Sequence, residues 1–88
     1  MCPKLKEVKA LEDYKVLLTF RNGEQRIYDM KELLKYDFYK NIRDKEKFQK
    51  VKVADGITIE WEDGEDVDPC NLYINSKPVR KEENESKK

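Results

Sequence analysis

The most regular pattern in the chain is an alternation of apolar and polar side chains over residues 14–21, which is typical of a strand with one buried face. Asn22-Gly23 follows, the pair preferred in a two-residue type I′ hairpin loop, where both residues need a positive φ. We therefore expect a hairpin that returns through residues 24–28, and a weaker alternation over residues 5–12 predicts a preceding strand. The apolar positions of the central strand are Val16, Leu18 and Phe20.

The pattern then changes to a helical period. Asp29 is a good N-cap and, with Glu32 three residues later, resembles a capping box. We expect a helix from Asp29 to about Asn41, which packs one face on the sheet, and then a short helical turn over residues 44–48 that buries Phe48. The apolar face of the long helix consists of Met30, Leu33, Leu34 and Phe38.

A second hairpin is predicted from residues 49–61, with a turn at Asp55-Gly56. Its second strand alternates between an apolar face and a polar face, and it ends at Asp63-Gly64. Asp68-Pro69 has the residue types of an N-cap and a first helical position, so a terminal helical turn through Tyr73 is expected. The apolar face of this strand holds Ile57, Ile59 and Trp61, and we expect the tryptophan in the core.

These elements predict an α+β domain over residues 1–76. Its mainly antiparallel sheet of about five strands, in the order strand-strand-strand-helix-strand-strand plus a terminal helical turn, would be covered on one face by one helix. Residues 77–88 have no periodicity and are nearly all charged or polar, so they are expected to form a disordered tail. The expected core is Val16, Leu18, Phe20, Ile27, Leu33, Leu34, Phe38, Phe48, Val51, Val53, Ile59 and Trp61.

Composition adds an internal charge asymmetry. The 88 residues are 38% hydrophobic and 43% charged with a net charge of zero, so no overall field favours nucleic acid or membrane. Residues 31–52, however, carry eight basic and four acidic side chains, and residues 53–76 carry seven acidic and no basic ones. Either the two segments face each other or stay solvated, or the acidic segment binds a basic partner.

Catalytic and metal-binding residue types are sparse. The chain has no histidine, and Cys2 and Cys70 are too few and too far apart for an ordinary zinc site, so we expect reduced thiols in a cytoplasmic protein. Aligning Gly64 with the glycine of an EF-hand loop does not place acidic ligands at the required positions. No apolar run is long enough for a membrane span. We expect no cofactor, no metal and no enzymatic activity.

Nucleic-acid binding would use the basic middle of the chain, with Tyr36 and Tyr39 nearby. Asp37, Asp44 and Glu46 interrupt this stretch, and the acidic segment would repel phosphate. Direct nucleic-acid binding is therefore not expected. The basic side chains are Lys40, Arg43, Lys45, Lys47, Lys50 and Lys52.

The chain also resembles the small bacterial proteins of the family known as domain of unknown function 2442. The resemblance implies an α+β fold with one main helix and no established activity. Some relatives are encoded beside another small protein, like toxin–antitoxin pairs, and some carry an added helix-turn-helix domain, which implies a partner-binding or regulatory role here. Many relatives have proline after the tryptophan, where this chain has Glu62. The matching residues are Tyr14, Val16, Leu18, Phe20, Asn22, Gly23, Glu24, Tyr28, Asp29, Met30, Phe38, Phe48, Gly56, Ile59, Trp61, Gly64, Asp66, Val67, Pro69, Leu72 and Tyr73.

Two hypotheses of function follow. The first is a noncatalytic protein-interaction or regulatory module whose acidic hairpin binds a basic protein partner, and the family resemblance implies one half of a two-gene, toxin–antitoxin-like pair. The alternative is a small enzyme or ligand-binding protein that uses carboxylates near Trp61, with Glu62, Asp66, Asp68 and Tyr73 as candidates. The expected partner-binding residues of the first hypothesis are Glu60, Glu62, Asp63, Glu65 and Asp66.

Overall fold

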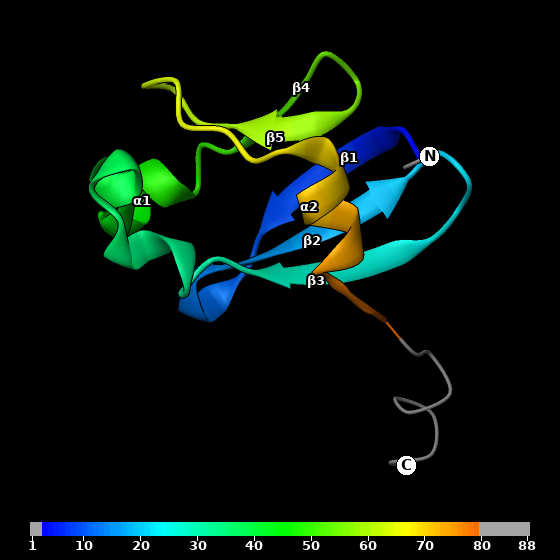
Figure 1. Cartoon of the computed structure of the whole chain (residues 1–88), viewed down its shortest axis with the longest axis horizontal. Coiled ribbons are helices and arrows are strands. Elements are labelled where there is room, and N and C mark those ends of the chain that lie inside the picture. Colours follow the sequence, from blue (N-terminus) through cyan, green and yellow to red (C-terminus); the bar gives the residue numbers. More distant parts are fainter. Residues whose placement is uncertain (1–2, 80–88) are drawn as a thin grey trace, which may run out of the picture.

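The computed structural model describes residues 3–79 and has an α+β fold, as the sequence predicts (Figure 1). Its strands are β1 (Leu5–Ala10), β2 (Lys15–Phe20), β3 (Gln25–Asp29), β4 (Lys52–Ala54), β5 (Thr58–Glu60) and β6 (Lys77–Pro78). Its α-helices are α1 (Lys45–Phe48) and α2 (Pro69–Ile74), and the 3₁₀ helices are η1 (Glu12–Tyr14), η2 (Leu33–Lys35) and η3 (Asp37–Arg43).

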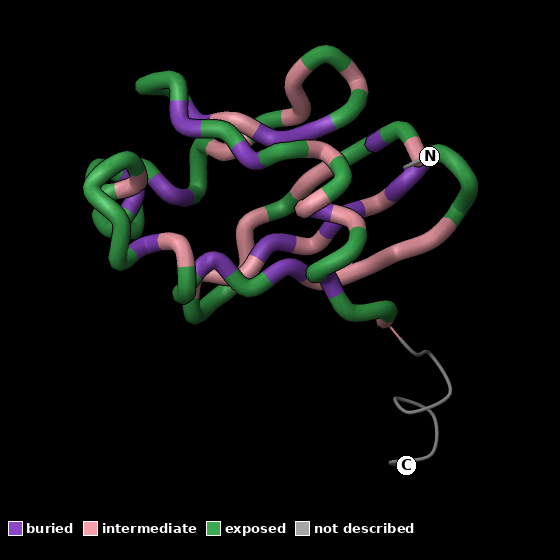
Figure 2. Tube along the Cα trace, viewed as in Figure 1, coloured by how far each residue is buried: buried purple, intermediate pink, exposed green. Residues whose placement is uncertain are grey.

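The strands form two antiparallel groups. One sheet has the order β1-β2-β3-β6, and β4 pairs with β5 in a separate hairpin. Along β2, buried residues alternate with half-buried ones, as the period of two requires (Figure 2). The hairpin is fixed beside β1 because the backbone N–H of Leu5 donates to the carbonyl of Gly56 at 2.9 Å. Helix α2 lies in front of the sheet in Figure 1.

The loop between β2 and β3 differs from the type I′ turn expected at Asn22-Gly23. Only Gly23 has a positive φ, at 93°. The N–H of Phe20 donates to the Glu24 carbonyl at 2.8 Å, and the N–H of Gly23 donates to the Phe20 carbonyl at 3.0 Å. These bonds define a loop of Arg21, Asn22 and Gly23, in which one glycine in the left-handed region reverses the chain.

The single long helix expected over residues 29–41 is wrong. The segment instead forms the two 3₁₀ helices η2 and η3, separated at Tyr36, whose φ of −87° and ψ of 144° are extended. Aspartate, asparagine and aromatic residues from residue 36 onward are poor helix formers, and tertiary contacts favour the tighter turns. The buried residue of η3 is Ile42, whereas Phe38, expected in the core, is 58% exposed.

The second hairpin is confirmed, but the burial of its second strand differs from the expectation at Ile57 and Thr58. Ile59 and Trp61 are buried, while Ile57 is exposed. Thr58, expected on the wet face, is buried because its hydroxyl donates to the carbonyl of Val67. The chain that follows the acidic turn thus contacts the threonine side of β5.

Trp61 occupies the core as predicted, with 1% of its surface exposed. Its indole Nε1–H donates to the carbonyl of Phe48 at 2.8 Å, and the two rings lie 5.7 Å apart between centroids. Asp44 caps α1, the short helix predicted to bury Phe48, by accepting from the N–H of Glu46 at 2.9 Å. The sequence therefore correctly predicted both members of this contact.

The C-terminal helical turn is also confirmed. Asp68 accepts from the N–H of Asn71 at 3.1 Å, and Pro69 stands at the start of α2. The predicted tail begins too early, because Lys77 and Pro78 form β6 and pair with β3. The remaining predicted tail, residues 80–88, lies outside the described residues.

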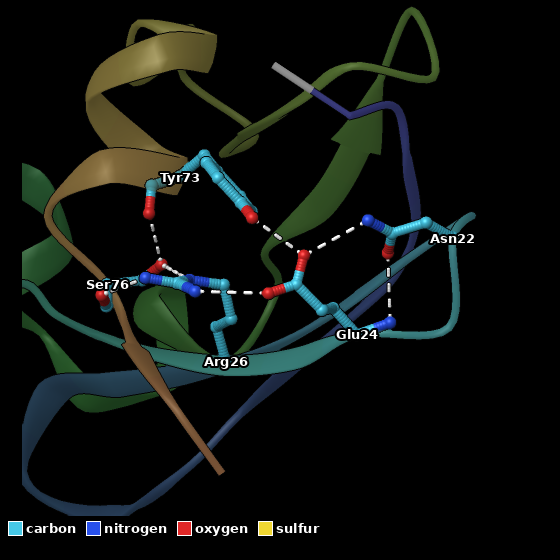
Figure 3. A network of polar contacts seen from close by, with 5 residues as sticks. All are labelled: Asn22, Glu24, Arg26, Tyr73 and Ser76. Carbon is cyan, nitrogen blue, oxygen red and sulfur yellow. Dashed lines mark hydrogen bonds and ion pairs between the residues drawn. The ribbon is translucent and has the colours of Figure 1, made fainter.

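A polar network joins α2 to β3 (Figure 3). The Glu24 carboxylate accepts from the Tyr73 hydroxyl at 2.7 Å and from Asn22 Nδ2 at 3.0 Å, and it pairs with Arg26 at 3.2 Å. The Arg26 guanidinium lies 4.5 Å from the centre of the Tyr73 ring and donates to the Ser76 carbonyl at 2.7 Å. This network attaches the segment after α2 to the sheet.

Trp61→Phe should lower the free energy of unfolding by about 2 kcal/mol, because it removes buried volume and leaves the Phe48 carbonyl without its donor. Urea unfolding followed by circular dichroism measures the change. Ile74→Ala is the control, since Ile74 is 68% exposed. An equally stable Trp61→Phe protein would contradict the central packing role of the indole.

Glu24→Gln should destabilise the protein in a pH-dependent way. The hydrogen bond from Tyr73, followed by that from Asn22, lowers the pKa of Glu24 below its usual 4.5. A lowered folded-state pKa stabilises the fold above the unfolded-state value, and this stabilisation is lost as the pH falls through the folded-state value. The difference in urea midpoint between wild type and variant should therefore be largest near neutral pH and shrink below about pH 4.5. A difference that does not change with pH would contradict this assignment.

Candidate protein-interaction site

The acidic loop, defined as residues 60–66, is a short turn with a fixed backbone. The N–H of Trp61 donates to the Glu65 carbonyl at 2.8 Å, and the N–H of Gly64 donates to the Trp61 carbonyl at 2.9 Å. Gly64 has a φ of 99°, which a residue with a side chain rarely adopts. Glu60 and Asp66 form an isolated antiparallel bridge at the base of the loop. The buried indole and this bridge hold the turn in one conformation.

This turn has the same design as the loop between β2 and β3. The segments FRNGE (residues 20–24) and WEDGE (residues 61–65) each consist of a buried aromatic residue, a charged residue, Asn or Asp, glycine in the left-handed region, and glutamate. Both are closed by the same two backbone hydrogen bonds. Five residues are too few to be recognised as a repeat in the sequence without the matching backbone.

Lysines of the basic segment line the acidic loop. Lys52 lies 3.7 Å from Glu60, Lys50 3.8 Å from Glu62, and Lys47 3.8 Å from Asp63, each measured between nitrogen and oxygen. The β4–β5 pairing places Lys52 opposite Glu60. The structure thus shows that the basic and acidic segments face each other at these three ion pairs.

The five predicted partner-binding residues do not share one environment. Glu60, Glu62 and Asp63 have side chains that are 37%, 73% and 49% exposed, and Asp66 is also exposed. Glu65 is only 3% exposed. Its side chain therefore does not belong to the accessible surface of the loop, and only the other four predicted residues are accessible to a partner.

Glu65 is unusual because its Oε1 atom is buried without a hydrogen-bond partner among the described residues. The equivalent residue of the first loop, Glu24, accepts from the Nδ2 atom of Asn22. In the second loop, the asparagine position is occupied by Asp63, whose side chain has no N–H group to donate. The missing amide donor is the chemical difference between the two loops.

An aromatic pair next to the acidic loop, the exposed Phe38 and the half-buried Tyr39, was not expected from the sequence as a surface feature. The Tyr39 hydroxyl donates to the Asp66 carbonyl at 2.7 Å, so η3 contacts the loop directly. Burial, followed by the negative charge of Asp66, raises the pKa of Tyr39 above its usual value. Phe38 packs edge-on against Tyr39 with 4.8 Å between ring centres. The helical pattern had assigned Phe38 to the core, which hid this surface.

The residues of the alternative hypothesis do not converge. Tyr73 donates its hydroxyl to Glu24, and Asp68 caps α2, whereas Glu62 and Asp66 belong to the exposed loop. Within residues 3–79, no group of three or more metal-ligating side chains has the geometry to hold an ion. Two hollows of about 580 and 280 Å³ lie elsewhere, the first between η1 and α1 and the second beside β3 and β6.

The state of the cysteines and the expected lack of a membrane span are the two remaining expectations. Cys70 takes part in a disulfide, so the expectation of a reduced thiol is wrong at this position, and Cys2 lies outside the described residues. No helix within residues 3–79 is both long enough and apolar enough to cross a membrane.

Comparison with known proteins identifies a family and nothing more specific. Residues 5–78 match the family model described as protein of unknown function, DUF2442. No curated protein and no solved structure matches the chain.

Asp63→Asn should raise the free energy of unfolding by about 1 kcal/mol, because the new amide can donate to the buried Glu65 Oε1 atom as Asn22 does to Glu24. The lost ion pair with Lys47 is exposed and worth less. Urea unfolding compares wild type, Asp63→Asn and Asp63→Ala, which removes the same ion pair without adding a donor. Equal midpoints for the two variants would show that Glu65 gains no partner.

Proposed function

Since the chain belongs to the DUF2442 family, whose function is unknown, we propose a function from its geometry: the protein is a noncatalytic interaction module that docks a basic surface of a partner protein on its acidic loop. The observation that carries this proposal is the loop itself, which presents Glu60, Glu62, Asp63 and Asp66 from a backbone fixed by hydrogen bonds and by the buried Trp61. A regulatory role follows if the partner is active when free.

The fixed backbone supports a binding role because it lowers the entropic cost of association. Two hydrogen bonds close the turn, and its glutamate and tryptophan ends are both buried. A loop that is already ordered loses little conformational freedom when a partner binds. The carboxylates of Glu62 and Asp63 therefore meet a partner in nearly their final positions.

The lysines that line the loop do not block such a partner. The three ion pairs have nitrogen–oxygen distances of 3.7–3.8 Å, and their side chains are between one-third and three-quarters exposed. Exposed pairs of this kind contribute about 0–1 kcal/mol each. A partner's arginine or lysine can replace them at small cost, and the displaced lysines return to solvent.

Reversing two loop charges, Glu62→Lys with Asp63→Lys, should abolish partner binding, because the basic surface of the partner would then meet two new lysines besides Lys47, Lys50 and Lys52. Affinity-tagged wild type and variant are used to recover partners from an extract of the source organism at low and high salt, followed by mass spectrometry. A specific protein should be retained by the wild type at low salt and lost from the variant.

The matched control is Glu7→Lys with Glu32→Lys, which changes the net charge equally at exposed positions on β1 and before η2. This control should retain the partner. Equal recovery by the loop variant and the control would exclude the acidic loop as the binding surface, and recovery of no specific protein by wild type at low salt would contradict the interaction role.

A further inference from the structure

Two aromatic side chains of the η2–η3 segment stand in solvent. Tyr36 is 54% exposed and Phe38 is 58% exposed. Large aromatic residues are usually at least half-buried in a domain of this size, and exposed ones are common at binding surfaces. The other large exposed apolar side chains among the described residues, Ile57 and Ile74, lie apart from this segment in the sequence, at the β4–β5 turn and at the end of α2.

The two aromatic rings have different electrostatic surroundings. Lys35 Nζ lies 5.7 Å from the centre of the Tyr36 ring, so a cation already occupies that face. Phe38 instead packs against Tyr39, whose hydroxyl is bonded to the backbone of Asp66. The same hydrogen bond places Asp66 next to this hydroxyl, and the Asp66 charge contributes to the raised pKa of Tyr39. Phe38 is thus the ring on the acidic side of the segment.

Asp66 is the acidic-loop residue whose carboxylate is available to a partner. Glu60, Glu62 and Asp63 are each paired with a lysine, but Asp66 takes part in none of the ion pairs found within residues 3–79. It is exposed, and Asp66 and Phe38 both contact Tyr39, Asp66 through its backbone carbonyl and Phe38 through its ring. An uncompensated carboxylate beside an exposed aromatic face combines the two features that bind an organic cation.

We propose that Phe38 and Asp66 together receive an arginine side chain of the basic partner protein. The inference rests on the proposed function and names the contact that would confer specificity. A guanidinium is planar, so it stacks on an aromatic face while its N–H groups donate to a carboxylate, whereas a lysine ammonium is a strongly hydrated point charge. The surface should therefore prefer arginine to lysine at equal net charge.

Cations already on this segment leave room for that arginine. Lys35 is placed over Tyr36, and Arg43 Nε donates to the carbonyl of Leu34 at 2.6 Å. Lys40 is the remaining cation of η3, and it follows Tyr39 directly in the sequence. The acidic loop contacts the segment through Tyr39, next to Phe38. A cationic arginine therefore complements the charge beside Phe38, although Lys40 is also near in the sequence.

The test uses fluorescein-labelled nona-arginine and nona-lysine peptides, titrated with the protein at low ionic strength and followed by fluorescence anisotropy. Wild type should bind nona-arginine about fivefold more tightly than nona-lysine, the range expected for one cation–π contact at a partly exposed site. Phe38→Ala and Asp66→Asn should each remove this preference, and the double variant should lose no more than either single variant.

Tyr36→Ala is the matched control, because it removes a ring of similar exposure from the same segment but on the lysine side. It should leave the arginine preference unchanged. All these positions are exposed, and circular dichroism should show that each variant keeps the wild-type fold.

The possible outcomes separate this inference from the proposed function. Equal binding of both peptides by wild type, with both lost on Glu62→Lys/Asp63→Lys, would overturn the arginine contact and leave the acidic docking surface. No binding of either peptide would overturn both. Binding of a deoxythymidine oligonucleotide that is lost in Phe38→Ala would assign the aromatic surface to nucleic acid, and this also overturns the arginine contact.

Discussion

The contact between Trp61 and Phe48 holds the two parts of this small domain together. The indole is buried, its N–H is bonded to the Phe48 carbonyl, and the two rings pack on one another. Phe48 ends α1 and also packs edge-on against Tyr14, which follows the β1–β2 turn. The Phe48 side chain thus connects the hairpin, the helical segment and the sheet. The acidic loop keeps its position because its second residue, Trp61, is held by this contact.

Charge is the second constraint on a chain in which 43% of the residues are charged. Lys47, Lys50 and Lys52 lie along the carboxylates of the loop, so they reduce the electrostatic repulsion among these carboxylates. Because these pairs are exposed and weak, they balance the negative charge of the loop but can be exchanged for the cations of a partner. The same surface is thereby stable alone and accessible to a partner, which is the property that an interaction module requires.

The two glycine loops show how one local sequence pattern acquires two roles. FRNGE and WEDGE share their backbone hydrogen bonds and their left-handed glycine. In the first loop the glutamate binds Asn22, Arg26 and Tyr73 and joins α2 to the sheet. In the second loop the glutamate is buried and an aspartate replaces the asparagine. Local sequence sets the turn, and the neighbouring elements decide what the glutamate contacts.

The sequence by itself determined the features that depend on neighbours along the chain. These are the alternating face of β2, the N-caps at Asp44 and Asp68, and the buried side of Ile59 and Trp61, since period and capping chemistry act over a few residues. Only the tertiary structure decided which short segments became 3₁₀ helices, where Phe38 points, and that Glu65 is buried beside exposed acids. A helical spacing of apolar residues is compatible with more than one backbone, and the choice among them depends on contacts from residues distant in the sequence.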